Sequence, residues 1–114
     1  MRPTTAERIN HIAEAIANIR DLVTGQTYES FANSLATRLA VERLLEIISE
    51  ASRHIPSDLK AKAPRINWRP LADLGNWLRH AYHRTDAGLL WSMTESDLEP
   101  LKEFIDQIGK ESNS

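Results

Sequence analysis

The sequence contains no cysteine. This absence excludes disulfide bonds, a thiol nucleophile and a thiolate metal site, and it is consistent with a reducing compartment. Long apolar runs are also missing, since none approaches the roughly 20 residues that a membrane-spanning helix needs. The first residues lack the apolar core of a signal peptide. We therefore expect a cytoplasmic protein that does not insert into a membrane.

Glycine is scarce, with only Gly25, Gly75, Gly88 and Gly109, and these are too scattered to form a Gly-rich phosphate loop. The sequence has no nucleophile elbow and no signature of paired catalytic carboxylates. No segment alternates polar and apolar residues, and no Asn-Gly or Asp-Gly pair marks a β-hairpin. These absences leave an all-helical protein without the common hydrolase motifs.

The residues that are present predict one globular domain spanning positions 1–114. Hydrophobic residues make up 41% of the 114 positions and charged residues 26%, which are ordinary values for a folded domain. A chain of this length can bury a substantial core. The periodic apolar positions described below predict an all-α fold, an antiparallel bundle of four to five helices.

Helix start and stop signals divide the first half of the chain. The Thr4 to Glu7 capping box opens a helix that Gly25 ends. The next apolar stripe predicts one long helix, from about Thr27 or Tyr28 to His54, where the Ile55-Pro56 pair ends it.

The second half contains shorter elements. Ser57 is expected to cap a short helix that Pro64 closes, and Asn67 to cap the central helix. One or two apolar helical turns are expected over residues 86–93. Asp97 is expected to cap the last helix.

The central stretch, residues 67–86, concentrates polar chemistry. The segment 60–84 carries a net charge of +5 in a chain whose net charge is −2, which suggests a local site for an anion such as phosphate. Its only acid is Asp73, and its basic residues are Lys60, Lys62, Arg65, Arg69, Arg79 and Arg84.

On a helix, Leu71, Leu74 and Leu78 would face the core. Asn76 and His80, four residues apart, would then share one face. Arg79 and His83 would lie on an adjoining strip, with Tyr82 nearby.

Simpler interpretations of these residues stay open. A helix with His and Arg is usually a solvated face, and Trp68, Trp77 and Trp91 are expected to be core residues. His80, His83 and Asp86 have a spacing that permits a metal ion, but no second pair completes such a site.

The same stretch resembles the signature of HepT-like toxins of the HEPN superfamily, an arginine, four residues, a histidine, any residue and a tyrosine. His80-Ala81-Tyr82 matches the end of this motif, and Asn76 matches the asparagine that often follows the arginine. The motif arginine itself falls on Gly75. Arg79, directly before the histidine, is a candidate replacement for that guanidinium.

The resemblance extends over nearly the whole chain. The run 45–51 followed by Ile55-Pro56 is similar to the end of the family's second helix. Residues 66–69 resemble the entry to the motif helix. Trp91 and the segment 98–101 match the family's C-terminal pattern.

The resemblance implies an HEPN-like fold and metal-independent RNA cleavage without a cofactor. The catalytic residues that it implies are His80, Arg79, Asn76 and Tyr82. Arg69, His83 and Arg84 are then expected to bind the phosphates of the RNA.

The resemblance also implies partners. HepT-like toxins are typically encoded beside an MNT-type nucleotidyltransferase antitoxin, which can transfer AMP to the motif tyrosine, here Tyr82. HEPN proteins generally place two motif helices across a homodimer cleft. Two alternatives remain: a HEPN subunit that has lost catalysis through Gly75 and binds a nucleotide or protein, and a purely structural bundle.

Overall fold

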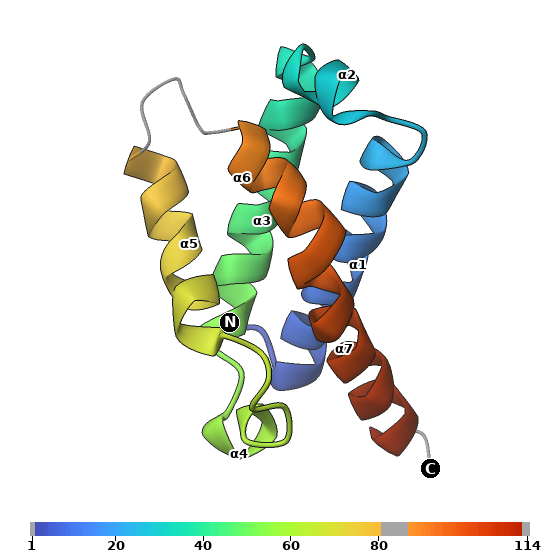
Figure 1. The fold of residues 1–114 in the computed structure, drawn as a ribbon. Helices are drawn as coiled ribbons and strands as arrows, with labels where there is room; N and C mark the ends of the chain where they lie inside the picture. The colour runs from blue at the N-terminus through green and yellow to red at the C-terminus, as the bar shows by residue number, and fades with distance from the viewer. Residues whose placement is uncertain (1, 81–86, 113–114) are drawn as a thin grey trace.

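Four helical segments alternate in direction along the bundle (Figure 1). The first three are α1 (Thr5–Val23), α3 (Leu35–Ser52) and α5 (Trp68–His80). The fourth is continuous and joins α6 (Ala87–Ser92), the π-helix η1 (Met93–Asp97) and α7 (Leu98–Ser112). The structure is a computed structural model that describes residues 2–80 and 87–112, and these residues contain no β-strand. The all-α antiparallel bundle is therefore confirmed.

The predicted long second helix is wrong, because the chain breaks it into α2 (Tyr28–Ala32) and α3. Ser34 lies in an extended conformation between them, and its hydroxyl accepts a hydrogen bond from the N–H of Thr37 at 3.3 Å. A serine that caps a new helix in this way satisfies an N–H that would otherwise lack a partner. The predicted start was right, since Thr27 caps α2.

Two of the predicted helix caps are wrong. Ser57 is the first residue of the short α4 (Ser57–Lys60), Pro56 occupies the cap position, and the helix ends well before Pro64. Asp97 lies inside η1, which passes into α7 without a break. Pro100, within α7, has no N–H for an intrahelical hydrogen bond, and a wider π-turn precedes it.

The core lies between α1, α3 and the fourth segment, and α5 closes one side. Ile12 and Ile16 of α1 pack with Leu45 and Ile48 of α3, and all four are at most 2% exposed. Trp68 and Trp91 pack against the edge of this core, as expected. Trp77 does not, since it is 45% exposed.

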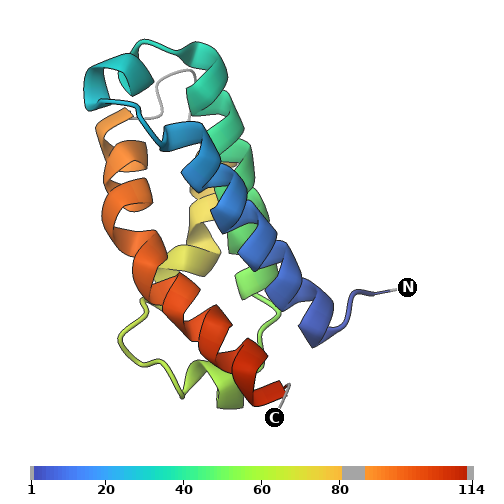
Figure 2. The same ribbon diagram turned by 90° about the vertical axis from the view of Figure 1, so that its right-hand side faces the viewer.

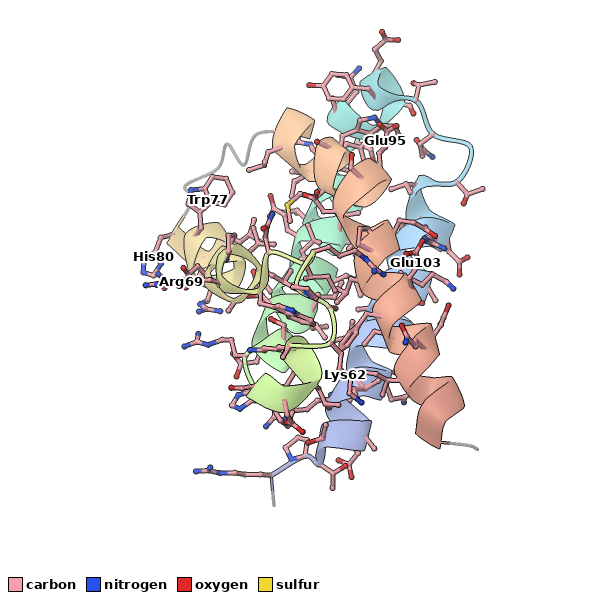
Figure 3. The ribbon with its side chains drawn as sticks, turned by 60° about the horizontal axis from the view of Figure 1, so that its bottom comes forward. Lys62, Arg69, Trp77, His80, Glu95 and Glu103 are labelled. Atoms are coloured by element: carbon pink, nitrogen blue, oxygen red, sulfur yellow. The ribbon has the colours of Figure 1, made fainter. Side chains whose placement is uncertain are left out.

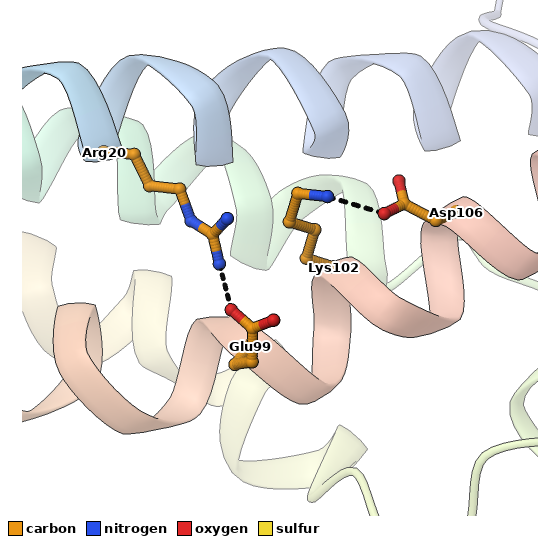
Figure 4. A network of polar contacts seen from close by, with 4 residues as sticks. All are labelled: Arg20, Glu99, Lys102 and Asp106. Carbon is orange, nitrogen blue, oxygen red and sulfur yellow. Dashed lines mark hydrogen bonds and ion pairs between the residues drawn. The ribbon is translucent and has the colours of Figure 1, made fainter.

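The fourth segment is held mainly by apolar burial. An ion pair joins Arg20 of α1 to Glu99 of α7, and Lys102 contacts Asp106 at 2.6 Å within α7 (Figure 4). These side chains are between 39% and 58% exposed, and exposed ion pairs typically contribute about 0–1 kcal/mol. The two chain ends lie at the same end of the bundle (Figure 2).

The packing of α5 depends on a close contact between Gly75 and Ser49 of α3. The N–H of Gly75 donates a hydrogen bond to Ser49 Oγ at 2.9 Å, and this hydroxyl donates to the carbonyl of Ala72 at 2.9 Å. A Cβ atom at position 75 would lie 3.0 Å from Ser49 Oγ and 3.3 Å from Ser49 Cβ. Glycine therefore lets the two helices approach closely.

We predict that Gly75→Ala lowers the free energy of unfolding by about 1 kcal/mol or more, as overpacked sites do. Ser49 is 1% exposed and held by two hydrogen bonds, so it cannot easily yield to the new methyl group. Urea unfolding followed by circular dichroism measures the change.

The matched control is Gly109→Ala in α7, where the added carbon meets no described residue within 4 Å beyond the adjoining helix backbone. The free energy of unfolding of this variant should rise by about 0.5–1 kcal/mol from helix propensity alone. Equal stabilisation of the two variants would contradict the tight contact at Gly75.

Candidate active site

The polar face of α5 points away from the bundle. Arg69, Asn76, Arg79 and His80 are all exposed. Helix geometry places His80 about 40° around the axis from Asn76 and about 20° from Arg69. In Figure 3, His80 and Arg69 project from α5 toward solvent. Leu74 and Leu78 are buried on the opposite side, as the sequence predicted, and this burial fixes which face α5 exposes.

His80 is oriented by its own helix. Its Nδ1 lies 2.8 Å from the backbone carbonyl oxygen of Asn76, one turn earlier. Because a carbonyl oxygen can only accept, Nδ1 must carry the proton of the neutral ring. Nε2 is then the nitrogen that carries the lone pair. This is the arrangement of an oriented base, and Asn76 provides it through its main chain.

Arg79 lies over Gly75. Its Nη1 is 3.4 Å from the position that a Cβ atom on residue 75 would occupy. The guanidinium is thus beside the position that aligns with the motif arginine. The two residues are four apart in sequence, so the helix places them next to each other on one face.

Arg79 also borders a hollow of about 290 Å³ between α5, α3 and α1. Three arginines and two glutamates are among the residues that line the hollow, which are Arg8, His11, Arg43, Glu46, Ile47, Glu50, Ala51 and Arg79. Arg43 and Glu46 form an ion pair at 3.2 Å. Sequence reasoning missed the contributions of α1 and α3, because no local spacing relates them to α5.

The basic segment does not form a single patch. Arg65 pairs with Glu103 at 3.2 Å, and Lys60 lies 5.7 Å from the centre of the Trp68 ring. Arg69 is three turns from His80, about 16 Å along the helix. The structure therefore places Arg69 far from the histidine, where it could contact only a different part of a long ligand.

Several of the predicted site residues belong to the segment 81–86. Tyr82, His83 and Arg84 lie outside the described residues, as does Asp86. Among residues 2–80 and 87–112, no group of three or more His, Cys, Asp or Glu side chains could hold a metal ion. No helix in the described part of the chain is long and apolar enough to cross a membrane.

Comparison with known proteins identifies the family. The model of the family described as "Ribonuclease HepT-like" matches residues 12–108. The chain belongs to the HepT-like ribonuclease family. The resemblance seen in the sequence is thus confirmed, and it covers most of the chain. No solved structure gave a significant match.

Relatives in this family carry ribonuclease names. "Probable ribonuclease HepT" of Thermococcus cleftensis is 36% identical over 96% of this chain and its own full length. A "Putative RNase" of Methanocaldococcus jannaschii is 35% identical over 85% of this chain and 89% of its own length. A "Gamma-glutamylcyclotransferase and putative RNase" of the same organism is 33% identical over 97% of this chain, which spans 50% of that relative.

We predict that the neutral rings of His80 and His54 adopt opposite tautomers. His80 should carry its proton on Nδ1, because of the Asn76 carbonyl. His54 should carry its proton on Nε2, which lies 3.2 Å from a carboxylate oxygen of Glu50. Long-range ¹⁵N–¹H NMR correlations distinguish the two forms. Nε2 protonation of His80 would contradict the oriented-base geometry.

Proposed function

We propose that this HepT-like protein is a metal-independent endoribonuclease in which His80 exchanges protons with the RNA. The observation that carries the proposal is the contact between His80 Nδ1 and the Asn76 carbonyl, which leaves Nε2 for the substrate. Arg79, the residue directly before His80, is also exposed. A positioned imidazole of this kind supports general acid–base catalysis near neutral pH.

The proposed reaction needs no bound metal for its proton transfers. Nε2 of one His80 removes the proton from a ribose 2′-OH, and the 2′ oxygen attacks the adjacent phosphorus. The bond from phosphorus to the 5′ oxygen breaks, leaving a 2′,3′-cyclic phosphate and a 5′-OH. A second group must protonate the leaving 5′ oxygen, and the candidates are a partner subunit's histidine and Tyr82. Asn76 and Tyr82 would also orient the phosphate.

Arg79 would supply the cation that the motif arginine normally provides. Its guanidinium can donate two N–H groups to a phosphate and stabilise the charge that develops in the transition state. The position of its Nη1 atom, 3.4 Å from where a Cβ atom on residue 75 would lie, supports this replacement. Arg69, His83 and Arg84 would bind phosphates further along the strand.

A homodimer would bring two such helices together. Leu35 and Leu39, near the start of α3, are 60% and 53% exposed, and Arg38 Nε is buried without a hydrogen-bond partner among the described residues. The start of α3 and the end of α5 lie at the same end of the bundle (Figure 1). A second copy seated there would lie near His80. Light scattering at micromolar concentration tests this arrangement, and a monomer would contradict it.

We expect purified protein to cleave RNA in EDTA and to leave cyclic-phosphate ends. His80→Ala and Arg79→Ala should each reduce the cleavage rate by at least about 100-fold, the range seen for loss of a general acid–base group or a charge-stabilising group. Gel assays with end-group analysis measure both effects. His54→Ala and Arg53→Ala, at the end of α3, are the matched controls and should retain full activity.

A different outcome would favour the alternative function. If folded, AMP-free wild type is inert, the glycine at position 75 has disabled catalysis. The chain is then a binding subunit for a nucleotide or protein. This alternative is supported by the glycine at position 75. It is buried against Ser49 and provides no side chain at the place of the motif arginine.

We further propose that the protein is the toxin of a toxin–antitoxin system and acts on cytoplasmic RNA. Its partner would be an MNT-type nucleotidyltransferase that transfers AMP to Tyr82. The added phosphate would place negative charge near His80 and Arg79 and occupy the RNA site.

Mass spectrometry after coexpression with such a nucleotidyltransferase should find AMP on Tyr82. The Tyr82→Phe variant should stay unmodified, and Tyr28→Phe, at an exposed tyrosine on α2, should be modified like wild type. Silencing of the toxin with Tyr82 unmodified would refute this mechanism.

A further inference from the structure

A second hollow lies on the other flank of α5. It has a volume of about 460 Å³ and separates α5 from the α6–η1–α7 segment. Its walls are mainly apolar and include Leu71 and Leu74 of α5 and Leu101 of α7. α5 packs most extensively on α3, and its side toward α6, η1 and α7 is left open. The volume falls in the range of sites that bind small ligands.

Trp77 forms one edge of this hollow. It is 45% exposed, whereas Trp68 and Trp91 pack against the core. Helix geometry places Trp77 one turn before His80 and about 60° around the axis. An exposed indole at this place provides a flat surface on which an unpaired base can stack.

The charges around the hollow oppose phosphate binding. Asp73 and Asp97 line it, and among the described residues that line it the only basic one, Arg65, is paired with Glu103. Carboxylates repel phosphate but accept hydrogen bonds from the N–H groups of a base. The hollow beside Arg79 differs, because three arginines, Arg8, Arg43 and Arg79, line it together with two glutamates. His80 lines neither hollow, and helix geometry places it between Arg79 on one side and Trp77 on the other.

We propose that the hollow beside Trp77 binds an unpaired nucleobase of the RNA next to the scissile phosphate. The base stacks on Trp77, and its edge donates hydrogen bonds to Asp73. Guanine presents two adjacent N–H donors and suits this carboxylate best, whereas uracil presents one. The inference rests on the proposed ribonuclease function, to which it adds a determinant of sequence specificity.

The test uses short 2′-O-methyl RNAs, which lack the attacking hydroxyl and cannot be cleaved. One has guanine and the other uracil at the central position, and fluorescence anisotropy gives their dissociation constants. Wild type should bind the guanine RNA more tightly. Trp77→Leu should weaken binding of the guanine RNA by about tenfold, as loss of one stacking platform does. Asp73→Asn should remove most of the preference for guanine.

Tyr28→Leu is the matched control, because Tyr28 has the same 45% exposure and lies on α2, outside the residues that line the hollow. It should bind both RNAs like wild type. The inference is overturned if Trp77→Leu binds both RNAs as the control does. It is also overturned if Trp77→Leu changes the mass measured by light scattering, since the hollow would then be a protein interface.

Cleavage of unmodified RNA by the same variants separates the two proposals. If wild type cuts RNA but Trp77→Leu leaves its sequence preference unchanged, the base site is wrong and the ribonuclease function stands. If wild type binds RNA through Trp77 and Asp73 but cuts none, the base site stands and the catalytic proposal fails.

Discussion

The contact between Gly75 of α5 and Ser49 of α3 determines where the motif helix lies. Two hydrogen bonds through the Ser49 hydroxyl join the helices, and the glycine allows this close approach because a Cβ atom would lie 3.0 Å from that hydroxyl. With this side of α5 held against α3, Leu74 and Leu78 turn toward the core and His80 turns to solvent. The orientation of the candidate base thus depends on a buried contact on another face of the helix.

The same contact lies where this chain departs from the motif that it resembles. At position 75 the helix faces α3, so the residue there contributes to packing and provides no charge. Arg79, one turn later, returns a guanidinium to the adjoining surface. Under the proposed function, this guanidinium would be the cation near the histidine.

The two flanks of α5 differ in chemistry because different helices border them. α1 and α3 bring charged groups of both signs to the side of Arg79, whereas the α6–η1–α7 segment brings apolar and acidic groups to the side of Trp77. An RNA strand has a charged backbone and flat bases, so a helix with these two flanks can separate the two parts of a nucleotide. His80 lies between them, where the backbone of such a strand would cross.

The sequence by itself determined the helical class, most helix starts, the buried stripe of α5 and the family, because these depend on local periodicity, capping residues and a short motif. It did not reveal the break at Ser34 or the π-turn before Pro100, where side chains and backbone compete for the same hydrogen bonds. Only the tertiary structure decided which residues lie beside Arg79 and whether Trp77 is buried. Arg8, His11 and Arg43 lie far from Arg79 in sequence, and Trp77 stays exposed, because helix packing sets distances that no spacing along the chain encodes.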